Sequence, residues 1–164
     1  VKQPHLAVAA VDLVPADVSM QLTLAGAQLD DEYGKRVTAA VAQSARSEWI
    51  GPLSRRISKQ ELSASHVCIV PSSAEGGANV VSEAIAAGTP ILCSAIPGNT
   101  GLLGHDWPGM FPAGDAQALA QLLTRTATDR DFFDELCQRT RALQPMVAPA
   151  TERQAWRELL AQLR

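Results

Sequence analysis

The amino-acid sequence predicts an α/β domain in which a Rossmann-like parallel sheet has helices on both faces. At 164 residues the chain can form one hydrophobic core, and its 46% apolar but only 4% aromatic content is typical of helices packed on a sheet. Patterns typical of strands alternate with patterns typical of helices along the chain. Two segments, 66–72 and 89–94, are largely apolar, as expected for strands covered on both faces.

In the first part of the chain, glycine and proline mark the ends of the expected strands. One strand stops at Gly26, and a shorter one is closed by Gly51 and Pro52. Ser58 is expected to cap a brief helix that runs through Leu62. The elements predicted before this helix are a helix over 3–14, a strand over 18–26, a polar helix near 30–46 and a strand over 47–52.

The second part continues the alternation and ends in helices. One helix is predicted to stop at Gly88, because helices often end at glycine, and Asp115 is expected to cap another. Pro145 and Pro149 separate the last two helices. The predicted strands are 66–72, 89–94 and 109–112, and the predicted helices are 77–88, a short turn after Asn99, 115–127, 130–143 and 151–163.

Charge and hydropathy exclude several classes of protein. The formal net charge of −3 leaves no excess of Lys and Arg to neutralise phosphates, so nucleic-acid binding is not predicted. No segment approaches the roughly 20 apolar residues that span a bilayer. The N-terminal residues do not resemble a secretory leader. We therefore expect a cytoplasmic protein without an integral membrane segment.

The three cysteines suggest neither a disulfide framework nor a metal site. Cys68 and Cys93 fall within apolar runs, Cys137 falls in a helical segment, and none belongs to a CxxC pair. We expect buried thiols that act as small hydrophobic side chains. No metal and no cofactor is predicted.

The first predicted element is a helix, whereas a doubly wound half of an enzyme normally opens with a strand. We therefore expect residues 1–164 to be one domain of a longer protein. The first strand of its sheet, and everything before that strand, is expected upstream of Val1.

The segment 69–99 is expected to carry the chemistry. A buried strand ends at Pro71, and the next helix begins near Ala78. The first amides of a helix are unpaired and partly positive, so they can hold a phosphate at this edge of the sheet. Gly76 and Gly77 allow a ligand to approach the backbone closely.

Two glutamates flank this helix start. Glu75 lies in the loop, and Glu83 lies about one and a half turns into the helix. Ionised carboxylates accept hydrogen bonds from hydroxyl groups, which a sugar and a ribose offer in adjacent pairs. The order glutamate, amides, glutamate therefore suits a nucleotide sugar. The same pattern also occurs by chance in α/β proteins, where Glu83 would be only a solvated helix residue.

The motif formed by Glu75, Gly76 and Glu83, followed by AIAAGTPIL, resembles the E-x7-E signature of family 4 retaining glycosyltransferases, which have two Rossmann-like domains (the GT-B architecture). The resemblance extends over nearly the whole chain. It implies that the chain is the C-terminal domain and binds a nucleotide sugar, most simply a UDP-sugar. It also implies that the N-terminal domain of the same enzyme is its partner and supplies the acceptor site. Further agreement lies at Ala25-Gly26, Ile50-Gly51 and Gly114-Asp115.

The resemblance implies a role for each matching residue. Glu75 is similar to the motif glutamate that contacts hydroxyls of the donor sugar, and it is the candidate catalytic residue. Glu83 is similar to the glutamate that grips the ribose, and Lys2 resembles the lysine of a basic pair that neutralises the diphosphate. The other implied donor-binding positions are Gly76 in the motif, Gly77 and Ala78 beside the sugar, and Asn79 and Val80 at the diphosphate.

The chain also departs from the family pattern. The family commonly has Phe-Gly where this chain has Gly77-Ala78, so a more open wall beside the sugar is expected. The arginine partner of Lys2 and the acceptor site would lie upstream, so residues 1–164 alone are expected to bind donor weakly and to transfer nothing. The loop Gly51–Leu53 stands where such domains usually meet the base.

A narrower resemblance is to the selenosugar synthases of selenoneine biosynthesis, which join a UDP-sugar to selenophosphate. It rests on EGGANVVSEAIAAG, IPGNTGLLGHDWPGMFPAGD and ERQAWRELLAQL. Other functions share the fold: a glycosyltransferase with another acceptor, a UDP-sugar epimerase, a sugar phosphorylase, and a non-catalytic nucleotide-binding module.

Three further features have structural interpretations. Asn99 is expected to cap a short helix rather than to reach the donor. Residues 105–107 are expected to form a surface loop with a half-buried Trp107 rather than part of an acceptor cleft. The last helix has an apolar stripe beside Trp156, which is expected to pack toward another domain.

Overall fold

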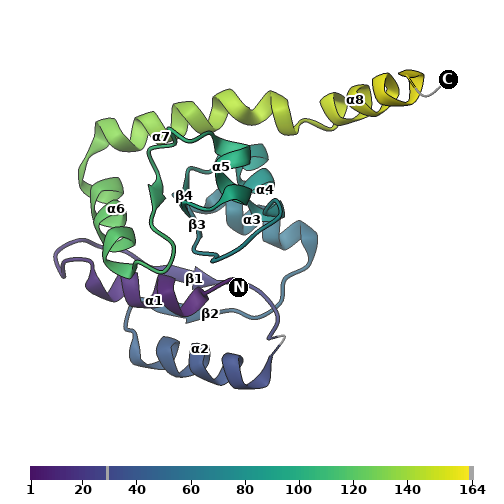
Figure 1. The fold of residues 1–164 in the computed structure, drawn as a ribbon. Helices are drawn as coiled ribbons and strands as arrows, with labels where there is room; N and C mark the ends of the chain where they lie inside the picture. The colour runs from purple at the N-terminus through teal and green to yellow at the C-terminus, as the bar shows by residue number, and fades with distance from the viewer. Residues whose placement is uncertain (29, 163–164) are drawn as a thin grey trace.

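The computed structural model describes residues 1–28 and 30–162, and it has the predicted α/β fold. Its strands are parallel and alternate with helices, as Figure 1 shows. They are shorter than predicted, because the flanking residues continue into loops at both ends. The strands are β1 (Leu22–Leu24), β2 (Ser47–Trp49), β3 (Cys68–Val70), β4 (Ile91–Ser94) and β5 (Met110–Phe111).

The strands form two hydrogen-bonded groups instead of one continuous sheet. β1 pairs with β2, whereas β3, β4 and β5 form a second group in that order. Leu22 stands opposite Ser47 in the first group, and Cys68 stands opposite Ile91 in the second. Across residues 1–28 and 30–162, no strand pairs with the other edge of β1 or of β3.

Helices cover both faces of the strands. On one face α1 (Pro4–Leu13) packs against α2 (Asp31–Gln43) and α6 (Ala116–Thr128). On the other face α3 (Arg55–Ala64) packs against α4 (Asn79–Ala87). The core between them is continuous and apolar. Its largest fully buried side chains include Phe111, Phe132, Ile85, Ile91, Leu92, Leu119 and Leu136.

Side-chain caps set several helix starts. The predicted cap of α6 is confirmed, because Asp115 accepts a hydrogen bond from the Ala118 amide at 2.8 Å. The predicted cap at Ser58 is wrong. Ser54 has extended backbone angles and accepts from the Ile57 amide, so α3 begins at Arg55, and the Ser58 amide already donates to the Ser54 carbonyl as an inner helix residue does.

The buried thiols follow the prediction at two of three positions. Cys68 and Cys93 are buried, and burial raises the pKa of each to about 12. Cys137 is only half-buried, on α7 (Arg130–Leu143). All three are free thiols.

Trp107 is fully buried, in contrast to the half-buried side chain predicted. Only 3% of it is exposed, and its Nε1 donates to the Ile91 carbonyl at 2.9 Å. Arg139 of α7 donates to both the backbone and the carboxylate of Asp106, and its guanidinium lies 5.7 Å from the Trp107 ring centre. The loop 105–107 therefore anchors α7 against β4.

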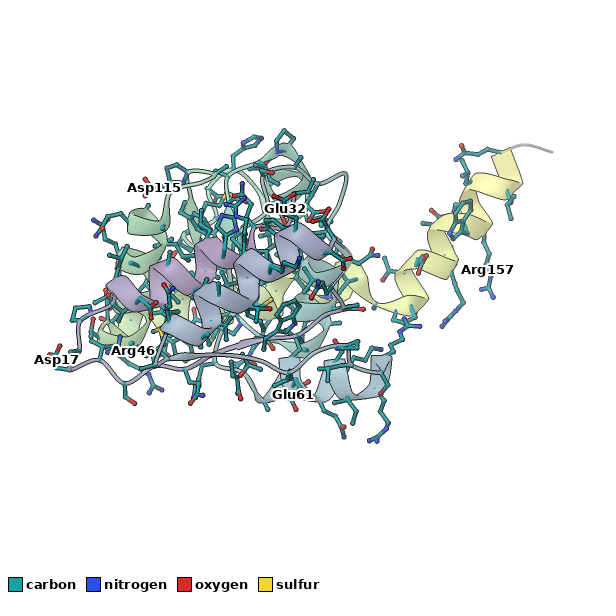
Figure 2. All side chains as sticks on the ribbon, turned by 90° about the horizontal axis from the view of Figure 1, so that it is seen from below. Asp17, Glu32, Arg46, Glu61, Asp115 and Arg157 are labelled. Carbon is teal, nitrogen blue, oxygen red and sulfur yellow. The ribbon has the colours of Figure 1, made fainter. Side chains whose placement is uncertain are left out.

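The C-terminal part of the chain leaves the body of the molecule. A 3₁₀ turn (Gln144–Val147) separates α7 from α8 (Pro149–Gln162), close to the break predicted from the prolines. Figures 1 and 2 show α8, which bears Arg157, standing away from the other elements. Trp156, Leu159 and Leu160 are roughly half exposed on it. Residue 163 of the predicted helix lies outside the described residues.

Within residues 1–28 and 30–162, no helix is both long enough and apolar enough to cross a bilayer.

Candidate functional site

Glu75 lies in the loop that joins the carboxyl end of β3 to α4. The Ser72 hydroxyl donates to its Oε1 at 2.7 Å. The Lys2 ammonium lies 2.5 Å from the same oxygen, although it comes from the segment before α1. The structure therefore brings together two residues that the sequence placed in one site.

The Glu75 carboxyl group is held in its ionised form. The hydrogen bond from Lys2 lowers its pKa most, and the hydrogen bond from Ser72 and the positive charge of Lys2 lower it further against the opposing effect of burial. Both side-chain partners reach Oε1. Among residues 1–28 and 30–162 no side chain donates to Oε2, which leaves this oxygen as an acceptor for a ligand hydroxyl.

Lys2→Met is expected to raise the pKa of Glu75 toward its ordinary value of 4.5. Because the pKa of Glu75 is lower in the folded than in the unfolded protein, the ion pair stabilises the fold at pH values above the unfolded-state pKa. This stabilisation is lost as the pH falls through the folded-state pKa. Lys2 is 66% exposed, so the contribution stays below about 1 kcal/mol. Carboxyl ¹³C titration by NMR measures the shift, with the exposed Lys35→Met as control. An unchanged Glu75 pKa would contradict the assignment.

Residues at the end of β4 and in the following helix support the Glu75 loop. The buried Ser94 hydroxyl donates to the Ser72 carbonyl. Gly98, in α5 (Pro97–Leu103), lies against the backbone of Glu75, so that a Cβ added there would stand 2.2 Å from the Glu75 carbonyl oxygen. The sequence did not predict three residues that support the Glu75 loop, namely Ser72, Ser94 and Gly98. Of these, only Gly98 carried a sequence signal, as a glycine directly after Pro97.

Asn99 does not cap α5, which corrects the prediction. Ile96 occupies the cap position, so Asn99 lies inside the helix. Its side chain is fully buried, and its Nδ2 donates to the Ser94 carbonyl at 2.9 Å. Its Oδ1 has no hydrogen-bond partner in the described part of the chain. Asn99 thus fixes the end of β4 and, through Ser94, the Glu75 loop.

The start of α4 presents free backbone amides. Gly77 has φ +146°, a conformation that favours glycine, and the helix begins two residues later at Asn79 rather than at residue 77. Ala78 occupies the cap position and has no side-chain hydrogen bond to offer. Its carbonyl accepts from Val81, whereas none of the described hydrogen bonds uses the amides of Asn79 and Val80. Partial positive charge therefore collects beside Glu75.

Glu83 lies further along α4 and lines a cleft that Lys2 and Ser72 also line. It is half-buried, which disfavours the alternative of a freely solvated helix residue. Its negative charge adds to the effect of burial in raising the pKa of Cys68, so the carboxylate lies on the side of α4 that faces β3. None of the ion pairs among the described residues involves Glu83.

The loops after β1 and β2 lie at the carboxyl ends of their strands. The Gly26 amide donates to the Gly51 carbonyl at 2.8 Å, and Trp49 Nε1 donates to the Gly26 carbonyl at 3.0 Å. Leu53, in the loop predicted to meet a base, lines the cleft with Gly26. The two loops are thus tied together at the carboxyl ends of their strands.

The cleft has a volume of about 1210 Å³ and is lined by Lys2, Ser72, Val80 and Glu83, among others. Its carboxylates accept hydrogen bonds from hydroxyls, while the ammonium and the helix amides attract an anion. The cleft also continues between the edges of β1 and β3. Within residues 1–28 and 30–162, His, Cys, Asp and Glu side chains form no group of three or more that suits a metal ion.

The family described as glycosyl transferases group 1 matches residues 1–142. No curated protein sequence matches the chain.

Solved structures of glycosyltransferases share the fold. Alr3699/HepE from Anabaena, solved with UDP and glucose, superposes with a TM-score of 0.82 at 20% identity, over 98% of this chain and 45% of its own. Sucrose-phosphate synthase from Thermosynechococcus elongatus gives a TM-score of 0.75 at 28% identity, over 98% and 43%. WaaG, a glycosyltransferase of lipopolysaccharide biosynthesis, gives 0.72 at 16%, over 88% and 39%. The chain thus spans less than half the length of each.

Proposed function

Because this chain belongs to the group 1 glycosyltransferases, we propose that it is the donor-binding C-terminal domain of a retaining GT-B glycosyltransferase and that its donor is a UDP-sugar. One observation carries the proposal. Val80 and Glu83 of α4 line one cleft at the carboxyl end of β3 together with Lys2 and Ser72, and both Lys2 and Ser72 hold the Glu75 carboxylate.

The fold relatives support the choice of donor. The Anabaena protein was solved with UDP, with UDP and glucose, and with UDP-glucose. A UDP-sugar consists of a sugar, a diphosphate, a ribose and a base, in that order. Along the chain, Glu75, the free amides at the start of α4 and Glu83 offer a carboxylate, partial positive charge and a second carboxylate in the same order.

Each residue of the edge takes one part of the donor in this proposal. Glu75 accepts hydrogen bonds from the sugar hydroxyls, beside the backbone of Gly76, Gly77 and Ala78. The amides of Asn79 and Val80 hold the diphosphate together with Lys2. Glu83 accepts from the ribose hydroxyls, and the loop Gly51–Leu53 meets the base. Support comes from Lys2, Leu53, Val80 and Glu83, which line the cleft, and from the bond between Lys2 and Glu75.

The proposed reaction needs little covalent chemistry from this domain. The bond between the anomeric carbon and the diphosphate oxygen breaks, and the acceptor nucleophile forms a new bond to that carbon with retained configuration. Negative charge develops on the leaving diphosphate. The first amides of α4 are preorganised to stabilise it, because they are already in place before the reaction. Lys2 joins them when it exchanges Glu75 for the diphosphate.

Glu83→Ala is expected to weaken UDP binding by the full-length enzyme about 10- to 100-fold. The substitution removes hydrogen bonds from a charged acceptor, worth about 1.5–3 kcal/mol. Isothermal titration with UDP measures the loss, and Glu32→Ala, an exposed carboxylate on α2, is the matched control. If Glu83→Ala binds UDP as the unaltered enzyme does, the ribose assignment is wrong.

The rest of the proposed enzyme is an N-terminal domain that supplies the acceptor site. The exposed apolar side chains of Trp156, Leu159 and Leu160 support an interface along α8, since such stripes on soluble proteins mark interaction surfaces. In this arrangement residues 1–164 bind the donor and leave the acceptor to the other domain.

We further propose selenophosphate as the acceptor, which would make the product a selenosugar. The support is the sequence resemblance of residues 75–88, 96–115 and 152–163 to selenosugar synthases. The full-length enzyme is expected to consume selenophosphate together with a UDP-sugar and to release UDP. Mass spectrometry of the product and coupled UDP detection follow the reaction, with phosphate in place of selenophosphate as control. UDP release with another acceptor but not with selenophosphate would support the glycosyltransferase proposal and would exclude a selenosugar as the product.

Two rival functions predict different products. A UDP-sugar epimerase would return an epimerised sugar without an acceptor, and a non-catalytic module would give no turnover at all. Incubation of the full-length protein with UDP-sugars alone, followed by chromatography of the sugars, distinguishes an epimerase from a transferase. The same incubation with an acceptor added distinguishes a non-catalytic module, which would release no UDP.

A further inference from the structure

We propose that Gln3 is a positioning residue of the candidate site, because its left-handed backbone turns the chain so that the Lys2 ammonium meets Glu75. The consequence for donor binding rests on the proposed function, in which Lys2 holds the diphosphate. The placement of Lys2 by Gln3 depends only on the geometry of the chain.

Gln3 has an unusual backbone conformation. With φ 47° and ψ 47° it lies in the left-handed region, and every other residue with positive φ in the ranges 1–28 and 30–162 is a glycine. This region is disfavoured for residues that carry a Cβ. A residue that precedes proline also favours an extended backbone, and Gln3 precedes Pro4. The local sequence therefore opposes the conformation, and the surrounding structure must impose it.

Two anchors impose the turn. On the N-terminal side, the Val1 carbonyl accepts hydrogen bonds from the Ser73 amide at 2.9 Å and from the Ser73 hydroxyl at 3.3 Å. On the C-terminal side, α1 begins directly after Gln3, and Leu6 in its first turn is buried in the core. Only Lys2 and Gln3 connect the two anchors, so the change of chain direction must fall on them.

The side chain of Gln3 does not explain its backbone conformation. It makes no capping hydrogen bond, although Gln3 occupies the cap position of α1. Its Oε1 is buried and has no hydrogen-bond partner in the described part of the chain. Burial of an unpaired acceptor opposes folding. The interaction that the turn does secure lies next to it, where Lys2 reaches Glu75.

A change at Gln3 is expected to act on Lys2, because the segment before Gln3 is the weaker of the two anchors. Val1 is 73% exposed and the Lys2 side chain is 66% exposed, whereas α1 is packed into the core. If residue 3 relaxes to an extended backbone, α1 stays in place and the segment before it changes direction. The Lys2 ammonium then leaves Glu75, while the Ser72 hydrogen bond to Glu75 can persist.

Substitutions of Gln3 in the full-length enzyme separate the backbone turn from the side chain. Gln3→Gly and Gln3→Ala both remove the side-chain amide, but only glycine adopts the left-handed conformation without a steric penalty. Gln3→Asn keeps an amide on a residue that tolerates this conformation. Gln3→Val introduces a β-branched side chain, which tolerates it least.

UDP affinity is expected to follow the backbone preference of residue 3. Gln3→Gly and Gln3→Asn are expected to bind UDP within about twofold of the unaltered enzyme, since both keep the turn. Gln3→Val is expected to bind at least about tenfold more weakly, the loss of one charged hydrogen bond, and Gln3→Ala to lie between. Isothermal titration measures the series. Equal affinity in Gln3→Gly and Gln3→Val would overturn the proposal.

The pKa of Glu75 reports the position of Lys2 without a donor, because the hydrogen bond from Lys2 is the largest cause of its lowered value. In Gln3→Val the pKa of Glu75 is expected to rise toward its ordinary value of 4.5, and in Gln3→Gly it is expected to stay low. Carboxyl ¹³C titration measures both. If Gln3→Val does not fold, Gln3→Ala replaces it, and a pKa of Glu75 equal to that in Gln3→Gly would overturn the proposal.

A double substitution shows whether Gln3 acts through Lys2. In the Lys2→Met background, Gln3→Val is expected to weaken UDP binding no further, because two changes that remove the same contact are not additive. An additive loss would indicate a general distortion and overturn the proposal. If Lys2→Met leaves UDP affinity unchanged while Gln3→Val still raises the pKa of Glu75, the proposed role of Lys2 at the donor is wrong and its placement by Gln3 is confirmed.

Discussion

Glu75→Gln in the full-length enzyme is expected to lower the rate of sugar transfer by about 10²- to 10³-fold, the usual effect of removing one preorganised group from a reacting centre. The amide keeps the shape of the side chain and one acceptor oxygen, so the Ser72 hydrogen bond can persist. The substitution removes the negative charge, which pairs with Lys2. In the proposed donor site the same charge accepts hydrogen bonds from the sugar hydroxyls.

Initial rates of UDP release at saturating donor measure the effect of Glu75→Gln, and circular dichroism checks that the variant folds. Glu32→Gln is the matched control, because it removes an exposed carboxylate from α2 outside the cleft. A Glu75→Gln enzyme with unchanged turnover would remove Glu75 from the catalytic site and leave it as a structural partner of Lys2.

Gly98→Ala is expected to weaken donor binding by at least about tenfold and to lower the free energy of unfolding by about 1–3 kcal/mol. The added Cβ would meet the Glu75 carbonyl oxygen at 2.2 Å and the Glu75 Cβ at 2.9 Å. Backbone atoms cannot swing aside as a flexible side chain does. The Glu75 loop must therefore move away from α5, which displaces the carboxylate from the start of α4.

Gly101→Ala is the matched control for Gly98→Ala. Gly101 lies one turn further along the same helix, is exposed, and has no atom within 4 Å of an added Cβ. Alanine there favours the helix by up to about 1 kcal/mol. Thermal unfolding and UDP titration compare the two variants. Equal donor affinity in both would show that Gly98 does not set the position of the Glu75 loop.

The sequence predicted those parts of the fold that local chemistry determines. All residues of β4 are buried, and its apolar run identified it as a covered strand. Asp115 was identified as a cap because it directly precedes an apolar helix. Ser54 was missed in favour of Ser58 because both are serines near a helix start, and only the backbone angles at Ser54 decide between them.

The candidate site was predicted only along one segment. Glu75 and Glu83 share a motif, so their spacing could be recognised in the sequence. Their roles in donor binding stay predictions. The resemblance placed Lys2 in the site, but its ion pair with Glu75 joins distant parts of the chain, and no local pattern predicts it. Asn99 was misassigned for a related reason: burial makes its side chain bind the Ser94 carbonyl, and burial depends on the packed tertiary structure.

The ion pair between Lys2 and Glu75 implies selectivity against incomplete ligands. A free monosaccharide can bind the open Oε2 of Glu75, but at Oε1 it must compete with Lys2, and it brings no anion that would satisfy the displaced ammonium. In the proposed donor site, a nucleoside diphosphate sugar would bring both, because its hydroxyls would replace Lys2 at Glu75 and its diphosphate would receive Lys2. For the proposed donor site, entry is thus an exchange of partners, and a free sugar that displaces Lys2 from Oε1 would lose the ion pair, at a cost below about 1 kcal/mol for so exposed a lysine.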